Sequence, residues 1–259
     1  MLADSHAHLD DHAFDADRTE VLQRARDAGI EQLVIPAVDA ASWARIRELC
    51  STHPRSLFPA YGLHPLYLHQ HAPGDVDALL SWCGANAAVA IGEIGLDFHL
   101  GELDPALQRD YFARQLAVAR ALDLPVIVHA RQALEEVILT LRRHAGVRGV
   151  VHSFSGSEEQ ARRLWQLGFL IGIGGPVTYE RAQRLRRIVA HMPLEFLLLE
   201  SDAPDQPDAG HRGQRNEPAR VAEVLRCVAA LRGKPEHAVA AATAANTRRL
   251  FRLPAPGHT

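Results

Sequence analysis

Short apolar segments alternate with amphipathic stretches along almost the whole chain, and this alternation constrains the fold more than any other feature. Near-continuous runs of Val, Ile, Leu and Ala are typical of parallel strands that helices cover. Eight strand–helix units close into a (β/α)8 barrel of roughly 250 residues, and the chain has 259 residues. We therefore predict an α/β fold, a TIM barrel, that forms a single domain over residues 1–259. The eight predicted strands span residues 2–8, 32–38, 57–64, 89–96, 125–130, 149–154, 168–174 and 195–201.

Several connecting segments carry clear helix signals. In 157–167, Ser157 is the expected N-cap, Gln160 follows it as in a capping box, and Gly168 stands after the helix. The other predicted elements are a helix at 104–123, two closing helices at 217–232 and 235–251, and a disordered tail at 254–259.

Composition excludes several classes of protein. The net charge of −3 provides no global positive field for nucleic acid, so any polyanion contact must be local. The three cysteines, Cys50, Cys83 and Cys227, are widely spaced and indicate neither a disulfide framework nor a thiolate metal site. No apolar run approaches the roughly 20 residues of a membrane span, and the first residues do not resemble a signal peptide. We expect a cytoplasmic protein with no membrane contact and no obligate protein partner.

Polar side chains stand where the predicted strands end. In a barrel of this type, the carboxyl ends of the strands face the active site. Alternate residues of a strand share one face, so His6 and His8, beside Asp4, can converge on one point. The other predicted strand ends carry His64, Glu93, His129, His152 and Asp202.

Four of these histidines and the two carboxylates form a candidate set of metal ligands, because imidazole and carboxylate both bind divalent ions. Six ligands would crowd a single ion, whereas two ions roughly 3.5–4 Å apart can share one carboxylate. Glu93 is the expected bridge, because its strand lies between the two histidine groups. On this interpretation His6, His8 and Asp202 hold one ion, and His129 and His152 hold the other.

Asp4 and Glu200 share the inward faces of their predicted strands. As structural groups they would be buried carboxylates that need partners. We favour the interpretation that both orient the metal ligands. The remaining histidines are expected in helices, loops or the tail, and the arginine-rich segment 181–187 is expected to be a solvent-exposed helix face.

A set of motifs extends from residue 4 to residue 251: D-S-H-A-H-L-D, G-L-H-P, G-E-I-G-L-D, P-V-I-V-H-A-R, H-S-F-S-G, L-L-L-E-S-D-A-P and N-T-R-R-L-F. With these motifs the chain resembles the TatD family of metal-dependent hydrolases, within the amidohydrolase group. The resemblance implies an amidohydrolase-like barrel, a binuclear metal site, and the phosphodiesterase or deoxyribonuclease activity of characterised members.

The segment 203–218, after Asp202, departs from the nuclease pattern. Many family nucleases resemble D-S-P-Y-L-A-P here, whereas this chain has D-A-P-D-Q-P, with Asp205 at the Tyr position. It keeps the basic H-R-G-Q-R-N-E-P at 211–218, and is more similar to the YjjV-type subgroup, whose substrate is poorly defined. Such a long polar loop indicates a functional segment, which we expect to set substrate choice.

The expected function is hydrolysis of phosphodiester bonds, as in a TatD-type deoxyribonuclease or 3′ exonuclease, on nucleic acid or a small phosphodiester. Two divalent ions (zinc, manganese or magnesium) would bridge a hydroxide. Asp202 and Glu93 are the expected catalytic residues, and Asp202 would accept or orient the proton of that hydroxide.

The expected substrate contacts are basic. His64 would contact a phosphate oxygen, although it could instead simply pack beside Pro65. The guanidinium group matches phosphate in a bidentate manner. The further candidates for phosphate binding are Arg131, Arg212 and Arg215.

Two other functional classes stay open. The same hydroxide could attack a carbonyl, as in an ester or amide hydrolase such as an aminoacyl-tRNA deacylase or a small-molecule amidohydrolase. A non-catalytic metal-binding or scaffold protein is the third class, and the complete ligand set argues against it. Lys234, the only lysine, is predicted between the closing helices. A carboxylated-lysine bridge or a Schiff-base lysine at a strand end is therefore excluded.

Overall fold

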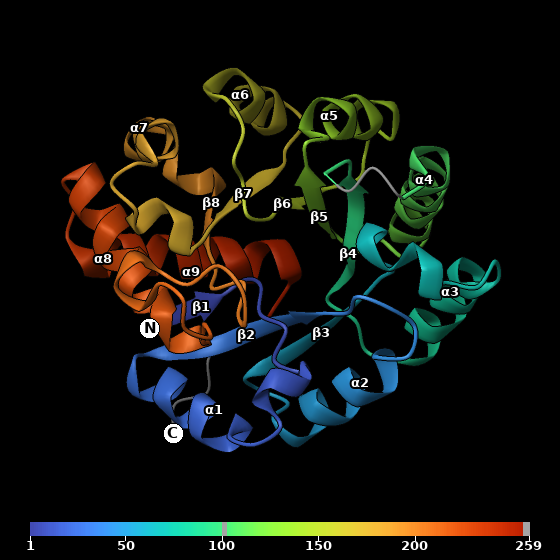
Figure 1. Cartoon of the computed structure of the whole chain (residues 1–259), viewed down its shortest axis with the longest axis horizontal. Coiled ribbons are helices and arrows are strands. Elements are labelled where there is room, and N and C mark those ends of the chain that lie inside the picture. The colour runs from blue at the N-terminus through green and yellow to red at the C-terminus, as the bar shows by residue number, and fades with distance from the viewer. Residues whose placement is uncertain (100–102, 256–259) are drawn as a thin grey trace.

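The computed structural model describes residues 1–99 and 103–255. Eight parallel strands pair in chain order around one barrel, which confirms the predicted TIM-barrel fold (Figure 1). The barrel closes between its first and last strands, where Ser5 N donates to Leu199 O at 3.0 Å and Ala7 pairs with Ala203. The strands are β1 (Leu2–Asp4), β2 (Ile30–Pro36), β3 (Leu57–Tyr61), β4 (Ala90–Asp97), β5 (Val126–Arg131), β6 (Gly149–Val151), β7 (Leu170–Ile173) and β8 (Leu197–Leu199).

Helices surround the barrel on the outside (Figure 1). Among the described residues, no helix combines the length and the apolar character that crossing a membrane requires. The helices are α1 (Arg18–Asp27), α2 (Trp43–Thr52), α3 (Asp75–Ala85), α4 (Pro105–Ala121), α5 (Leu134–Arg143), α6 (Glu158–Gln166), α7 (Gln183–His191), α8 (Val221–Arg232) and α9 (Glu236–Phe251).

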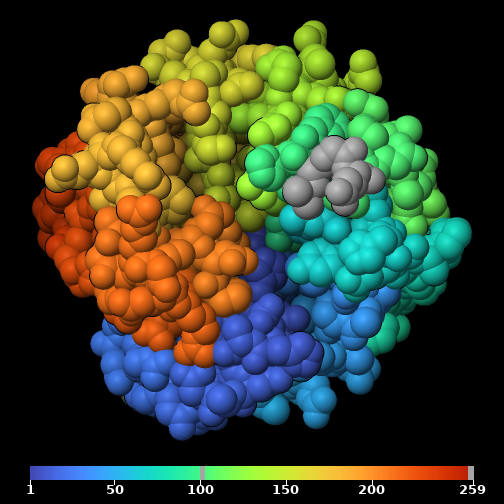
Figure 2. All heavy atoms as spheres, viewed as in Figure 1, coloured from blue at the N-terminus to red at the C-terminus, as the bar shows by residue number. Residues whose placement is uncertain are grey.

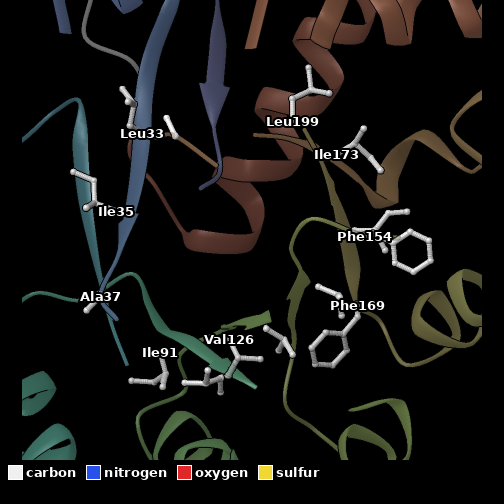
Figure 3. Close-up of a cluster of buried hydrophobic side chains, with 14 of the residues drawn as sticks. Leu33, Ile35, Ala37, Ile91, Val126, Phe154, Phe169, Ile173 and Leu199 are labelled. Atoms are coloured by element: carbon white, nitrogen blue, oxygen red, sulfur yellow. The ribbon is translucent and has the colours of Figure 1, made fainter. Parts of the chain in front are cut away.

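Both faces of the strands are buried, which explains their continuous apolar sequences. Leu33 and Ile35 of β2 belong to the larger cluster, which includes helix side chains, and Val34 between them belongs to a smaller cluster of mainly strand residues. This alternation is the period of two of a strand. Figure 3 shows Leu33 and Ile35 along β2 and Ala37 directly after its end. The smaller cluster therefore fills the barrel, and the larger one binds the helices to it.

The end of α9 closes the barrel where the strands begin. Leu250, Phe251 and Leu253 join the smaller cluster inside the barrel. Gln32, near the start of β2, donates through Nε2 to Pro254 O at 3.0 Å. The opposite end, where the strands finish, is the open face that carries the candidate site.

Several predicted elements match and others differ. The Ser157–Gln160 capping box of α6 is present. β1 and β6 stop at Asp4 and Val151, short of the predicted 8 and 154, because the chain leaves the ladder to form loops over the barrel. α8 begins after a 3-10 turn at 218–220 rather than at 217. Of the tail expected to be disordered, residues 256–259 lie outside the described residues.

Candidate metal centre

A cavity of about 880 Å³ opens at the carboxyl end of the strands. Figure 2 shows this face hollowed near its centre, between the orange segment after β8, the blue segment after β1 and the cyan segment after β3. His6 is fully buried beneath the cavity. The other predicted metal ligands line it directly: His8, Glu93, His129, His152 and Asp202.

Glu93 lies at the centre of the ligands and presents one carboxylate oxygen to each of two groups. It lies within β4, not at its end as the sequence suggested, and its side chain is buried. Oε2 lies 3.2 Å from His6 Nε2 and 3.3 Å from His8 Nε2. Oε1 lies 3.1 Å from His129 Nδ1 and 2.7 Å from His152 Nε2. The two predicted groups of histidines therefore match the two carboxylate oxygens of Glu93: His6 and His8 contact Oε2, and His129 and His152 contact Oε1.

The partners of His8 and His129 show which ring nitrogen faces Glu93 and is without a proton when the ring is neutral. His8 Nδ1 lies 3.1 Å from Pro36 O, an acceptor, so it must donate. His129 Nε2 lies 2.8 Å from Asp97 Oδ2, so it also donates. In each neutral ring the remaining nitrogen then directs a lone pair at a carboxylate oxygen of Glu93. Two acceptors that face one another need a proton or a metal ion between them, so this donor set fits divalent metal ions.

His64 has the opposite ring polarity. Its Nδ1 accepts a hydrogen bond from Leu66 N at 3.1 Å, so Nε2 carries the proton and donates to Glu93 Oε1 at 3.0 Å. Although His64 lies close enough to Glu93 and His129 to count among the possible ligands, a protonated nitrogen offers no lone pair to a metal. His64 is therefore a proton donor beside the ligands.

The electrostatics of the site follow from five imidazoles packed around one buried carboxylate. Burial alone would raise the pKa of Glu93, but the charges of His152, His64 and His6 hold it well below its usual value. Burial and the neighbouring His152 lower the pKa of His6. Burial opposes the charge of His152 as well, yet Glu93 raises its pKa to about 10. Protons and metal ions would therefore compete for the same positions.

Asp202 completes the group around His6. Its Oδ1 lies 3.5 Å from His6 Nε2 and 3.9 Å from His8 Nε2. Its Oδ2 accepts a hydrogen bond from Gln206 Nε2, which also contacts Ser153 Oγ at 2.6 Å. Burial raises the pKa of Asp202. Gln206 thus fixes one carboxylate oxygen and leaves the other directed at the histidines.

Asp202, Gln206 and Ser153 share an unusual backbone conformation. Their φ angles are 58°, 51° and 47°, in the left-handed region that side chains other than glycine rarely adopt. Each such conformation lowers the stability of the folded state by about 1–3 kcal/mol, and it persists only where the surrounding structure enforces it. The three strained residues are linked by their own side-chain hydrogen bonds, so this strain is concentrated beside the candidate ligands.

Asp4 and Glu200 hold the backbone next to the ligands. Asp4 Oδ1 accepts from His6 N at 3.1 Å and from Ser201 N at 3.0 Å, which ties two ligand-bearing loops together. Glu200 Oε1 accepts from Ser153 N, the residue after His152. Burial raises the pKa of Asp4 to about 7 and that of Glu200 to about 8. The contacts agree with an orienting role that acts through the backbone rather than through the imidazole rings.

Two residues of the site were not predicted from the sequence. Asp97 is fully buried and holds His129, and Gln206 holds Asp202. Asp97 stood inside the quoted G-E-I-G-L-D motif, four residues after Glu93, a spacing that places both side chains on one face of a strand. That signal could have identified Asp97. No comparable pattern marks Gln206, because its contact depends on how the loop after β8 folds back.

The predicted arginines separate into two groups. Arg131 lines the cavity, whereas Arg212 and Arg215 do not. Arg215 makes a salt bridge with Asp17 at 2.7 Å, and its guanidinium lies over the Phe14 ring. In the segment 181–187, Arg181, Arg184 and Arg187 are exposed as expected, and the first two also line the cavity.

The chain is similar to several known proteins in sequence and in structure. The family model described as TatD related DNase matches residues 3–252. The chain is 41% identical over 256 residues to the uncharacterized metal-dependent hydrolase YjjV of Escherichia coli K12, covering 97% of this chain and 98% of that protein. It is 35% identical over 247 residues to the 3′-5′ ssDNA/RNA exonuclease TatD of Erwinia tasmaniensis, covering 93% and 95%. The crystal structure of Escherichia coli YjjV superposes with a TM-score of 0.94 at 39% identity, over 98% of each chain.

Proposed function

Because the chain belongs to the TatD family of metal-dependent hydrolases, we propose that it hydrolyses phosphodiester bonds at a centre of two divalent metal ions. One observation carries this proposal: Glu93 presents one oxygen to His6 and His8 and the other to His129 and His152. A carboxylate shared in this way suits two cations that it holds against their mutual repulsion.

The ligand assignment and the metal type follow from the donor atoms. His6, His8 and Asp202 would hold one ion, His129 and His152 the other, with Glu93 between them. Four imidazoles and two carboxylates suit zinc or manganese better than magnesium, which prefers oxygen ligands. Divalent ions, when bound, lower the pKa of coordinated water and polarise the ester.

Asp202 and His64 would handle protons on opposite sides of Glu93. Burial raises the pKa of Asp202, so this carboxylate is suited to accept a proton from the attacking water. His64 directs its Nε2 proton into the site, where a phosphoryl oxygen could replace Glu93 as its acceptor. Arg131, on the cavity wall, would add a bidentate contact to the same phosphate.

Nucleic acid or a small phosphodiester is the proposed substrate. The Erwinia relative is named as an ssDNA/RNA exonuclease, which supports nucleic acid. The cavity volume of about 880 Å³ lies within the 300–1,000 Å³ typical of small-ligand sites, so the cavity would accept the end of a strand or a dinucleotide rather than a duplex.

Metal analysis and a substrate screen test the proposal together. Protein purified with added zinc or manganese should carry close to two metal equivalents per chain. It should hydrolyse single-stranded DNA and bis-p-nitrophenyl phosphate, and chelation should abolish both activities. A stoichiometry of one that is unchanged in His129→Ala with His152→Ala would exclude the two-metal centre. Turnover of aminoacyl-tRNA or carboxylic esters, without turnover of either phosphodiester, would show that the metal centre serves acyl chemistry instead.

A further inference from the structure

The cavity beside the metal centre has two walls of opposite charge. Arg131, Arg181 and Arg184 line one part of it, and we call them the arginine wall. A second set lines another part, and we call it the acidic wall: Asp10, Asp11 and Asp205. The reaction proposed above uses one phosphodiester and at most one guanidinium, so it leaves most of this charge unexplained.

The arginine wall comes from one sector of the barrel. Arg131 is the last residue of β5. The other two lie after β7: Arg181 comes two residues before α7, and Arg184 lies in its first turn. Arg184 donates to Ser155 O at 2.8 Å, which ties α7 to the loop after the intervening strand β6. The acidic wall follows β1 and β8, which adjoin through the Ala7–Ala203 pair. Because β1 lies across the barrel from β5 (Figure 1), the walls bound the cavity from different sides.

The arginine wall has no ionic partner within the described residues. No described carboxylate lies within 4 Å of the Arg131, Arg181 or Arg184 guanidinium, whereas Arg215 on the outer surface is held by Asp17. A guanidinium that lines a concave site without a carboxylate keeps its donors available for an anion. Arg181 also lies over the Tyr179 ring, with 5.4 Å between its Cζ and the ring centroid. Such stacking restrains the side chain while leaving its edge donors exposed.

We propose that Arg181 and Arg184 of the arginine wall form a second anion subsite, which binds a terminal phosphate one unit away from the phosphodiester that is cleaved, while Arg131 serves the cleaved phosphodiester itself. The proposal rests on the proposed phosphodiesterase function and narrows its substrate to short or terminal nucleotides that carry a further phosphate. Guanidinium groups match the geometry of a phosphate in a bidentate manner. The acidic wall repels a phosphate chain that would continue in the other direction, so it favours one orientation of the substrate in the cavity.

Three dinucleotides with the same scissile bond test the subsite. They are dithymidylate without a terminal phosphate, with a 5′-phosphate, and with a 3′-phosphate. The metal-loaded wild type should cleave one phosphorylated form with a kcat/KM about tenfold or more above that of the unphosphorylated form. In Arg181→Ala with Arg184→Ala, this ratio should fall towards one. The ratio compares two substrates on one protein preparation, so partial unfolding of the variant does not change it.

Arg187→Ala is the matched control. Arg187 lies on α7, is exposed and does not line the cavity, so its removal should keep the wild-type ratio. Equal kcat/KM for all three dinucleotides in the wild type would overturn the subsite. A preference that survives in Arg181→Ala with Arg184→Ala would overturn it as well.

A binding measurement separates failure of the subsite from failure of the proposed function. Methylphosphonate-linked dithymidine resists hydrolysis and has an uncharged linkage, so versions with and without a terminal phosphate differ only in that group. Calorimetry with the metal-loaded protein should show tighter binding of a phosphorylated version, and Arg181→Ala with Arg184→Ala should remove the difference. This result supports the subsite even where none of the dinucleotides is cleaved. Equal affinity of all versions for the wild type refutes the subsite, whatever bond the enzyme hydrolyses.

Discussion

His129 donates a hydrogen bond from Nε2 to Oδ2 of Asp97 at 2.8 Å, across the neighbouring strands β5 and β4. This contact fixes the ring so that Nδ1 faces Glu93 and carries a lone pair when the ring is neutral. The buried carboxylate therefore decides whether His129 can act as a ligand, although Asp97 itself does not touch the proposed metal positions.

Asp97→Asn should weaken metal binding by about 10- to 100-fold, the usual effect of removing a carboxylate that supports a ligating histidine. The amide has one acceptor oxygen where the carboxylate has two, and both are used, by His129 and by His99 N. Competition with a chromophoric chelator would measure the affinity. Asp110→Asn, on the exposed part of α4, is the control and should leave the affinity unchanged. Wild-type affinity in Asp97→Asn would contradict the orienting role.

Glu93→Gln and Asp202→Asn should differ in their effects on metal content and turnover, because the two carboxylates have different proposed roles. The neutral amide at 93 no longer holds two cations together, so at least one metal equivalent should be lost together with activity. Asp202→Asn leaves His6, His8 and Glu93 in place, so most of the metal should remain while turnover falls by about 10²- to 10⁴-fold. Elemental analysis and circular dichroism would establish metal content and folding. Near-normal turnover in Asp202→Asn would remove its proton-handling role.

Gln206→Leu should lower kcat about tenfold or more with little change in KM. Leucine has a similar size but cannot donate to Asp202 Oδ2, and a hydrogen bond to a charged group is worth about 1.5–3 kcal/mol. Steady-state kinetics on bis-p-nitrophenyl phosphate would measure the effect. Gln214→Leu, an exposed position in the same loop, is the control. An unchanged kcat in Gln206→Leu would mean that Asp202 keeps its orientation without this contact.

Arg212→Ala with Arg215→Ala should raise KM for a long single-stranded oligonucleotide and leave a dinucleotide unaffected. Neither side chain lines the cavity, so any phosphate contact that they make lies outside it. Each lost contact should reduce the slope of log affinity against log salt by about 0.7. Kinetics at several salt concentrations would measure this slope. An equal loss on both substrates would show that the loop shapes the metal centre.

The pH dependence of stability should change in Glu200→Gln, measured on metal-free protein by urea unfolding. Burial raises the pKa of Glu200 from 4.5 to about 8, so the folded state keeps a proton that the unfolded state releases. The contribution of Glu200 to the free energy of unfolding is therefore fully present below pH 4.5 and is lost as the pH rises towards 8. Glutamine is neutral throughout, so the variant should lack this contribution. Parallel pH profiles for the two proteins would contradict the raised pKa.

The fold was predictable because the barrel buries both faces of every strand, which leaves continuous apolar runs such as the one around Val34. Sequence patterns placed the strands well but not their ends. β1 stops at Asp4 because the chain there crosses to pair with the segment after β8, a contact between residues about 200 positions apart. A pattern of local spacing contains no record of such a contact.

The candidate ligands were predictable for a related reason: strand ends of a barrel converge, so histidines and carboxylates at those ends meet. The residues that hold the candidate ligands or line the cavity were harder to predict from the sequence. Gln206 and the pairing of Arg215 with Asp17 depend on the path of a long loop, and an arginine in a basic motif has the same sequence whether it binds phosphate or a neighbouring aspartate. Arg181 and Arg184 are exposed as predicted, but helix periodicity does not show that this exposed face borders the cavity.

The left-handed conformations of Ser153, Asp202 and Gln206 imply a trade-off between durability and catalysis. Glycine adopts these φ angles without steric conflict, so replacement of any of the three would relieve local strain. A laboratory selection for thermal stability alone should therefore enrich glycine at these positions and yield proteins with a higher Tm but no catalytic activity. A selection that also demands turnover should retain the original side chains. Positions where the two selected populations differ would be those at which the original side chain lowers stability but is required for catalysis.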